Sequence, residues 1–246
     1  MTRTITKAEL ADRILGAWTG KSWGAVIGEP HEYDYQGVIY DGPIEVHPQA
    51  PSEWLYREDD LYTNMAFLEV LRDKGLDATT ADFAAVFTQK NFMLWHANGQ
   101  ARQNLLEGIA PELCGHPVYS PHADDIDFQI ECDFIGIISP GLPIAARDMA
   151  LRAGRLMNYG DGLYAGVYLA QLYTDAFFIA DPVALVTRGL AAIPADCDYA
   201  QMILDCLAWF EEAPGDWRLS WRRLEDKWNH DLCPWAQSGN GRFNIQ

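Results

Sequence analysis

Glycine recurs at every fourth position near the start of the chain, at residues 16, 20, 24 and 28. Four residues make about one helical turn, so the four glycines would share one face of a helix. Each interior glycine costs a helix about 1 kcal/mol relative to alanine. The pattern therefore predicts a helix whose backbone another helix approaches very closely. A membrane helix of the small-xxx-small type is excluded, because Arg13, Lys21 and Glu29 bracket too short an apolar stretch.

Helical patterns continue along most of the chain, which predicts an all-α fold formed by a single compact multi-helix domain. A capping box from Thr6 to Glu9 opens the first helix. Residues 33–57 are rich in Gly, Pro and Tyr and predict a long loop, and within it Val38 to Tyr40 is the best strand candidate. Further helices are expected at about residues 61–71, 79–95, 98–109, 125–138, 143–157, 161–180, 182–193, 199–212 and 216–229.

Three consecutive acids, Glu58, Asp59 and Asp60, stand at the start of the helix expected at 61–71, whose end is marked by Gly75. A helix N-terminus offers about half a positive charge, which offsets far less than three carboxylates. Two interpretations stay open. The acids alone favour an acidic N-cap with a solvated first turn, whereas a bound divalent cation would offset the repulsion fully, since hard cations such as Mg²⁺ take oxygen ligands.

A second acidic stretch contains Asp125, Asp127, Glu131 and Asp133 among apolar residues. On a helix, residues 127 and 131 lie one turn apart and share a face. A solvated acidic face is the favoured interpretation, because most charge runs are solvated. The alternative is a polar wall of a cleft, with Asp133 reaching a ligand.

Two predicted helix junctions carry candidate binding residues. His96 could be a base or a phosphate donor, but it is interpreted as capping the last carbonyls of one helix, and Asn98 as the N-cap of the next. At the second junction, Asp161 is predicted to cap the following helix, leaving Tyr159 free to project. Tyr159 could stack on an adenine or ribose face, and the alternative is a plain helix–turn–helix corner.

Composition excludes several classes of protein. A net charge of −17 argues against broad electrostatic binding of nucleic acid or an anionic membrane, and it would repel a diphosphate ligand unless cations or local backbone donors receive it. Five cysteines without a Cys-x-x-Cys pair predict free thiols in a reducing cytoplasm. The N-terminal residues lack the apolar stretch of a signal peptide, and no segment is apolar enough to span a bilayer.

Four motifs in this order, from about residue 10 to the end of the chain, resemble the ADP-ribosylglycohydrolase family (the dinitrogenase-reductase-activating glycohydrolase type). They are the glycine-spaced helix with its Gly28–Glu32 turn, the acids at 58–60, the loop at 138–143, and the junction at 158–162. The chain departs from the family at Glu58, where Thr or Asn is commoner, and at Lys21, where many members carry Asp.

A further departure concerns the end of the chain. The family's second motif, Gly-x-Asp-x-Asp, is not found near the C-terminus. Asp196-Cys197-Asp198 comes too early and predicts a helix start before Tyr199. We therefore expect residues 1–246 to be an ADP-ribosylglycohydrolase-like helical domain whose C-terminal portion is missing.

The resemblance implies a metal-dependent hydrolase that cleaves an ADP-ribosyl N- or O-glycosidic bond. Mg²⁺, or Mn²⁺, would be the cofactor, with two ions in a complete family member. The partner would be an ADP-ribosylated protein or a small ADP-ribosyl compound, with no nucleic acid and no membrane; the oligomeric state is not predicted. The alternative is a catalytically incomplete ADP-ribose-binding or structural module. The implied site residues are Glu32 and Asp60 for catalysis, Glu58, Asp59 and Asp60 for metal, and Asn98, Gly99, Asp133, Gly141, Tyr159 and Asp161 for substrate.

Overall fold

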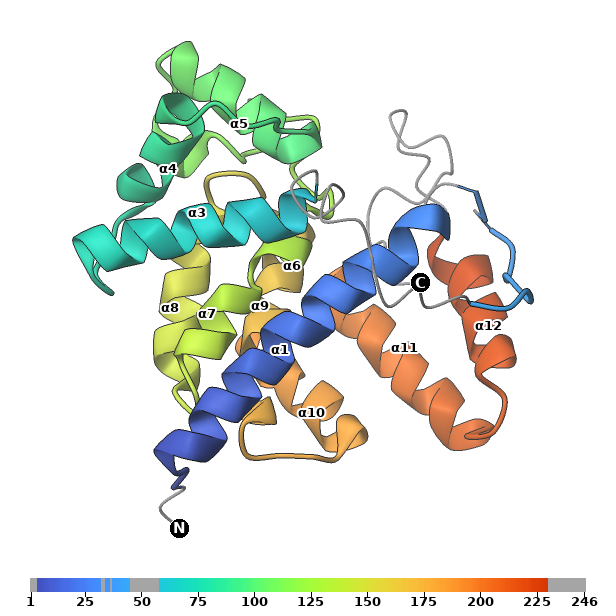
Figure 1. Cartoon of the computed structure of the whole chain (residues 1–246). Helices are drawn as coiled ribbons and strands as arrows, with labels where there is room; N and C mark the ends of the chain where they lie inside the picture. The colour runs from blue at the N-terminus through green and yellow to red at the C-terminus, as the bar shows by residue number, and fades with distance from the viewer. Residues whose placement is uncertain (1–3, 32–33, 36, 45–57, 230–246) are drawn as a thin grey trace.

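The computed structural model describes residues 4–31, 34–35, 37–44 and 58–229, and all regular elements within them are helices (Figure 1). The predicted all-α class is therefore confirmed, and residues 38–40 form no strand. The α-helices are α1 (Lys7–Gly28), α3 (Asp59–Lys74), α4 (Thr80–Gln89), α5 (His96–Leu106), α6 (Asp127–Glu131), α7 (Asp133–Ile138), α8 (Pro143–Gly154), α9 (Gly160–Ala176), α10 (Pro182–Gly189), α11 (Asp198–Glu212) and α12 (Trp217–Trp228). The 3₁₀ helices are η1 (Glu29–His31), η2 (Pro111–Leu113) and η3 (Leu190–Ala192).

Helix α9 lies at the centre of the fold, where α6, α7, α8, α10 and α11 all contact it. Glycine allows the closest of these approaches. A Cβ added at Gly166 of α9, or at Gly154 of α8, would meet the ring of Phe128 on α6. The fully buried Phe128 ring thus fills the space that these two glycines leave, and it anchors α6 between α8 and α9.

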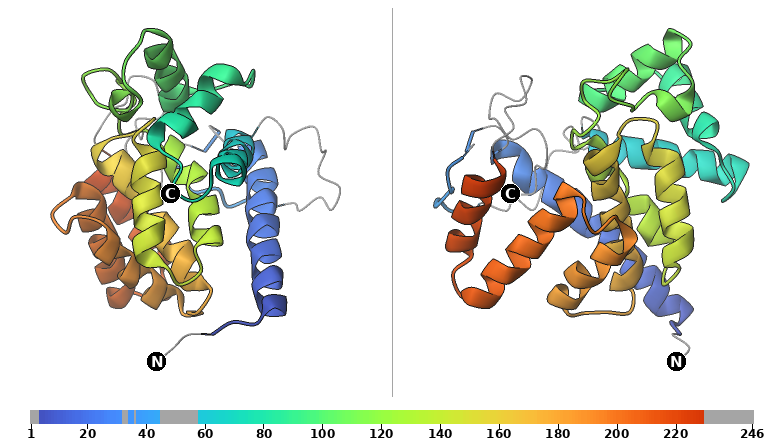
Figure 2. Two further views of the ribbon diagram at one scale, coloured as in Figure 1. Left: turned by 90° about the vertical axis from the view of Figure 1, so that its left-hand side faces the viewer. Right: turned by 180° about the vertical axis from the view of Figure 1, so that it is seen from behind.

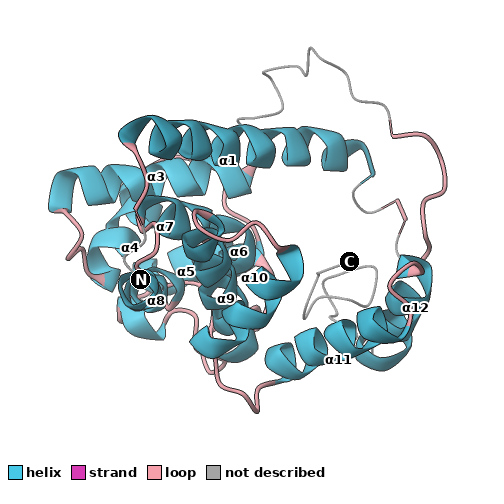
Figure 3. Cartoon of the chain, turned by 90° about the horizontal axis from the view of Figure 1, so that it is seen from below, coloured by secondary structure: helices cyan, strands magenta, loops and turns pink. Residues whose placement is uncertain are grey.

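An aromatic cluster fixes the position of α3. The ring of Phe67 on α3 lies 5.1 and 5.7 Å from the rings of Phe83 and Phe87 on α4, and 5.8 Å from that of Phe134 on α7. All four rings are fully buried, and such pairs add to the hydrophobic stabilisation. Seen from below, α3 and α1 run along one side of the molecule, while α11 and α12 extend from the other (Figure 3). The N-terminal turn of α3 is thereby held next to α6 and α7.

Helix α1 runs along the outer edge of the α6–α9 group (Figure 2), and no residue of α1 is fully buried. Arg13 donates to the carbonyl of Phe177, and Trp18 packs against the core. The predicted close approach to its glycine face is wrong for the described part of the chain. A Cβ added at any of the four glycines would meet nothing within 4 Å there.

Several predicted helix ends are confirmed. Thr6 and Glu9 form the capping box, α3 ends at Gly75 with φ of 83°, and α11 starts at Asp198. The helix predicted at 79–95 instead ends at Gln89, where the guanidinium of Arg102 takes up backbone carbonyls on both sides of the helix end. Arg102 donates to the carbonyls of Phe87 at 2.5 Å, Phe92 at 2.9 Å and Lys90 at 3.2 Å.

Two further boundaries differ from prediction. The helix expected at 125–138 is divided into α6 and α7 at Cys132. Beside this break the Ile130 carbonyl meets Asn64 of α3, and Asp133 meets Lys21 of α1. Helix α5 starts at His96, so Asn98 lies inside this helix and is not its N-cap. In the described ranges, none of the helices has the length and apolar character needed to cross a membrane.

Candidate metal-binding carboxylate cluster

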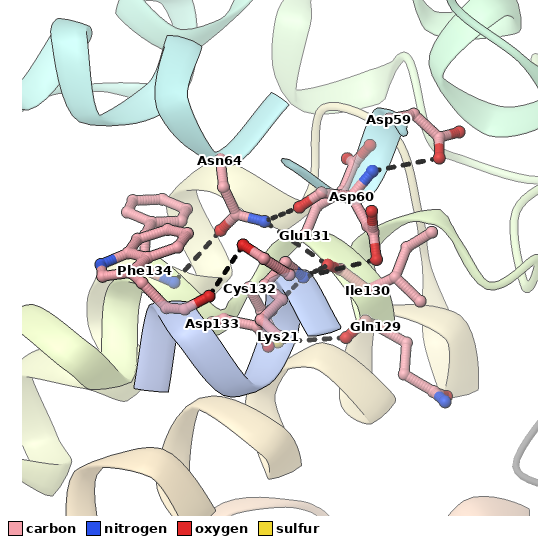
Figure 4. Close-up of polar contacts among 12 residues, drawn as sticks. Lys21, Asp59, Asp60, Asn64, Gln129, Ile130, Glu131, Cys132, Asp133 and Phe134 are labelled. Atoms are coloured by element: carbon pink, nitrogen blue, oxygen red, sulfur yellow. Dashed lines mark hydrogen bonds and ion pairs between the residues drawn. The ribbon is translucent and has the colours of Figure 1, made fainter. Parts of the chain in front are cut away.

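Acidic side chains gather where the first turn of α3 meets α6 and α7, and Figure 4 labels Asp59, Asp60, Glu131 and Asp133 among them. We call them the carboxylate cluster: Asp59, Asp60, Asp127, Glu131 and Asp133. Helical geometry explains the grouping, since Asp127 and Glu131 lie one turn apart on α6, as the sequence predicts. The predicted solvated face is wrong, however, because Asp127, Glu131 and Asp133 are all buried.

The fully buried Asn64 joins α3 to α6 and α7 at this point. Its amide nitrogen donates to the carbonyl of Asp60 at 2.5 Å and to that of Ile130 at 3.4 Å. Its amide oxygen accepts from the backbone N–H of Phe134 at 3.1 Å. One side chain thus satisfies backbone groups of three helices or turns, and it fixes Asp60 relative to the turn between α6 and α7.

Lys21 of α1 also enters the carboxylate cluster, where it reaches Asp60 and Asp133 (Figure 4). Its ammonium forms a short ion pair with Asp133, donates to the carbonyl of Ile130 at 2.6 Å, and lies 3.7 Å from Oδ2 of Asp60. Burial raises the pKa of Asp60 and of Asp133, while the Lys21 charge lowers each. Burial acts to lower the pKa of Lys21, but the charges of Asp133 and Asp60 raise it above its ordinary value.

Asn98 organises the other half of the cluster. Its backbone N–H donates to Oδ1 of Asp127 at 3.0 Å, and its side-chain amide donates to Oε1 of Glu131 at 2.6 Å. Burial raises the pKa of Asp127 to about 7, against the hydrogen bond from Asn98. Burial also raises the pKa of Glu131 well above its ordinary range, and the charges of Asp59 and Asp127 raise it further. Both carboxyls therefore favour the proton unless a cation lies beside them.

Four oxygens in and beside the cluster are of the type that binds cations. Oδ1 of Asp60, Oδ2 of Asp127, Oε2 of Glu131 and Oδ1 of Asn98 are buried without a hydrogen-bond partner among the described residues. Buried polar atoms are usually partnered, so four such oxygens around one cluster call for an explanation. Carboxylate and amide oxygens are the ligands that Mg²⁺ and Mn²⁺ take in proteins, and this donor set fits such an ion.

The edge of the cluster adds a histidine. Ligand atoms of His96, Asp125 and Asp127 lie within 4.8 Å of one another. His96 is the first residue of α5 and has φ of 33°, a left-handed conformation that is strained for a histidine. The neighbouring His122 lies 2.6 Å from Asp125, and this hydrogen bond raises the pKa of His122. The interpretation of His96 as a helix C-cap is wrong, and the sequence has no pattern that would show its nearness to Asp125.

Most of the metal and catalytic residues implied by the resemblance fall in or beside this cluster. Asp59 and Asp60 form the first turn of α3, and Glu58 is the half-buried residue before it, making no side-chain cap hydrogen bond to the helix. Asp133 lies in the half that Lys21 enters. Glu32 lies outside the described residues.

The implied substrate residues divide between two ends of the fold. Asn98 hydrogen-bonds to two acids of the cluster, and Gly99 follows it on α5. Tyr159 is exposed, before the start of α9, with its ring 4.6 Å from that of His116. Gly141 donates to the carbonyl of Thr174, near the C-terminal end of α9. The 17 residues of α9 span about 25 Å, so α9 separates Gly141 from Tyr159.

Asp161 has a different role from the one predicted. It makes no cap for α9, and its Oδ1 accepts the backbone N–H of Tyr199 at 2.9 Å, in the first turn of α11. The carboxylate therefore links the starts of these two helices. Its position at a helix N-terminus was predictable from sequence, but the helix that it serves was not.

An apolar cavity of 540 Å³ lies apart from the carboxylates, lined mainly by α9, α10 and α11. Gln129 of α6 contributes to its wall. Residues two apart on a helix point to opposite sides, so Gln129 faces away from Asp127 and Glu131, as Figure 4 shows for Gln129 and Glu131. The cavity is therefore not the site where the carboxylates act.

The fold and site define an all-α protein whose helices bring a cluster of carboxylates together. Residues 6–240 match the family model described as ADP-ribosylglycohydrolase, so the chain belongs to the ADP-ribosylglycohydrolase family. Family members hydrolyse glycosidic bonds to ADP-ribose. Comparisons with curated proteins and with solved structures gave no match.

Proposed function

We propose that this protein hydrolyses an ADP-ribosyl N- or O-glycosidic bond with the help of a divalent cation, Mg²⁺ or Mn²⁺, at the carboxylate cluster. The observation that carries the proposal is the set of buried oxygens on Asp60, Asp127, Glu131 and Asn98 without hydrogen-bond partners. The substrate would be an ADP-ribosylated protein or a small ADP-ribosyl compound. Family membership supports the ADP-ribosyl substrate, and the donor set supports the cation.

The residues have distinct roles in this proposal. Asp59, Asp60, Asp127 and Glu131 would hold the ion, with Glu58 and the His96–Asp125 edge next to it. A bound ion would lower the pKa of a water molecule and stabilise negative charge that develops during cleavage. Asn98 orients Asp127 and Glu131 through two hydrogen bonds, so the carboxylates are pre-arranged before any ligand arrives.

The remaining implied roles are also proposals. Asp60 would act near the reacting bond, and Glu32 would act as base or gate. Asp133, Gly99 and Tyr159 are proposed to contact substrate; Tyr159 has an exposed ring suited to stacking. The family resemblance also implies Gly141 and Asp161 as substrate residues. In the structure the Gly141 N–H donates to the carbonyl of Thr174, and the Asp161 carboxylate accepts the backbone N–H of Tyr199.

The test is release of free ADP-ribose from ADP-ribosylated protein and from a small ADP-ribosyl compound, with Mg²⁺, with Mn²⁺ and with EDTA. We expect release with a divalent ion and none with EDTA. The variant Asp59→Ala/Asp60→Ala should lose it, whereas Asp73→Ala/Asp148→Ala, which changes two exposed carboxylates, should keep it. A chain that binds ADP-ribose but releases none from these substrates would favour the catalytically incomplete binding module. Release of ADP-ribose in the presence of EDTA would contradict the need for a divalent cation.

A further inference from the structure

Lys21 is the residue of α1 that enters the carboxylate cluster. The helix has no fully buried residue, yet the Lys21 side chain is only 8% exposed. A lysine in that position loses most of its hydration, which is unfavourable unless its three N–H groups find acceptors. The structure supplies acceptors from two other segments of the chain, so the side chain is held in a defined place.

The surroundings of the Lys21 ammonium match those of a small metal ion. Its neighbours are a carboxylate oxygen of Asp133, Oδ2 of Asp60 and the carbonyl oxygen of Ile130. Two carboxylates and one backbone carbonyl form the kind of oxygen set that binds Mg²⁺ or Ca²⁺. Lysine has donors and no acceptor, so it can serve in this place only as a cation.

Asp60 connects this place with the other half of the cluster. Its Oδ2 faces Lys21, while its Oδ1 is buried without a partner among the described residues. Lys21 thus engages one oxygen of Asp60 and leaves the other without a partner among the described residues. A divalent ion placed between Asp60 and Asp133 would meet the ammonium at close range, and the two positive charges would repel each other.

We propose that Lys21 is a tethered cation that takes the place of a second divalent ion between Asp60 and Asp133, so the cluster binds one divalent ion and not two. The inference rests on the proposed function only in requiring that a divalent ion binds the cluster. Lys21 is a positioning residue in this account: it acts through Asp60 and Asp133 and touches no reacting atom.

The count of bound Mn²⁺ tests this directly, by electron paramagnetic resonance of the free ion during titration of the full chain. We expect one Mn²⁺ per wild-type chain and two per chain in Lys21→Met, which removes the charge and keeps a similar length. Arg13→Met is the matched control, since Arg13 is a cation of the same helix that donates to Phe177 away from the cluster. This variant should bind one ion.

Thermal unfolding supplies a second readout. Lys21→Met leaves Asp60 and Asp133 without their ammonium, so its melting temperature should rise more steeply with added Mn²⁺ than that of wild type or Arg13→Met. Two ions on the wild-type chain would overturn the inference and leave the proposed function standing. One ion on both wild type and Lys21→Met would also overturn it.

The outcomes separate this inference from the proposed function. No ion on wild type would contradict both the count of one ion and the cation of the proposed function, even if Lys21→Met bound one. If Lys21→Met does not fold, the number of Mn²⁺ ions on the wild-type chain decides. Two ions would show that Lys21 does not occupy the place of a second ion.

Discussion

Asp127→Asn is expected to remove a pH-dependent loss of stability. Asp127 is 3% exposed, and burial raises its pKa to about 7. The unfolded chain has the ordinary aspartate pKa of about 3.9. The folded state therefore binds this proton more tightly than the unfolded state does. Its stabilising contribution is complete below about pH 3.9 and is lost as the pH rises through about 7.

The magnitude follows from the shift. About 3 pKa units at 1.36 kcal/mol each correspond to about 4 kcal/mol over the whole range. About 2 kcal/mol of this is lost between about pH 5.5 and about pH 8.5. Asparagine keeps the oxygen that accepts from the Asn98 N–H and cannot ionise. Its buried amide adds a cost of about 1–3 kcal/mol if unpartnered, but that cost is the same at both pH values.

Urea unfolding followed by circular dichroism at the two pH values measures the effect, with EDTA present so that no divalent ion compensates the charge. Between the acidic and the alkaline value, wild type should lose about 2 kcal/mol more stability than Asp127→Asn. Asp148→Asn is the control, since the Asp148 side chain is 68% exposed and should follow wild type. Equal losses in Asp127→Asn and wild type would refute the reasoning.

Two predictions concern glycines. Gly20→Ala should raise the free energy of unfolding by about 1 kcal/mol, because the new Cβ meets nothing in the described residues and alanine favours the helix. Denaturant titration measures this change. A loss of stability would show that another segment packs on the α1 glycine face. Gly136→Ala should lower the free energy of unfolding by about 1–3 kcal/mol, since its Cβ would lie 2.6 Å from the carbonyl oxygen of Ala170 and against Tyr173. An unchanged unfolding midpoint in the same titration would contradict the close packing of α7 on α9.

Local chemistry made the fold class and several helix ends predictable from the sequence. Thr6 and Glu9 cap their own helix, and Gly75 ends α3 in a conformation that suits glycine, so neither needs information from distant residues. The end of α4 depends on Arg102, which lies on the next helix and takes three carbonyls. The pattern of apolar positions in the sequence does not predict such a side-chain-to-backbone contact.

The candidate site was predictable only in part, because local patterns are visible in the sequence and tertiary contacts are not. The acids at 59 and 60 and the shared face of Asp127 and Glu131 are visible in the sequence, but their burial is not. The contributions of Lys21 and Asn64 are tertiary, because each side chain bonds to a segment 66 to 112 residues away. The apolar neighbours of the second acidic stretch, such as Phe128 and Phe134, were the sequence signal against a solvated face.

Calorimetric titration of Mg²⁺, followed by ADP-ribose, into the full chain tests the central claim most directly. The variant Asp127→Asn/Glu131→Gln keeps the shape of both side chains and removes their charges. We predict that wild type binds Mg²⁺ and then ADP-ribose, and that the folded variant loses the Mg²⁺ heat. A folded wild-type chain that binds no Mg²⁺, or a variant that binds it as well as wild type, would contradict a cation site at the carboxylate cluster.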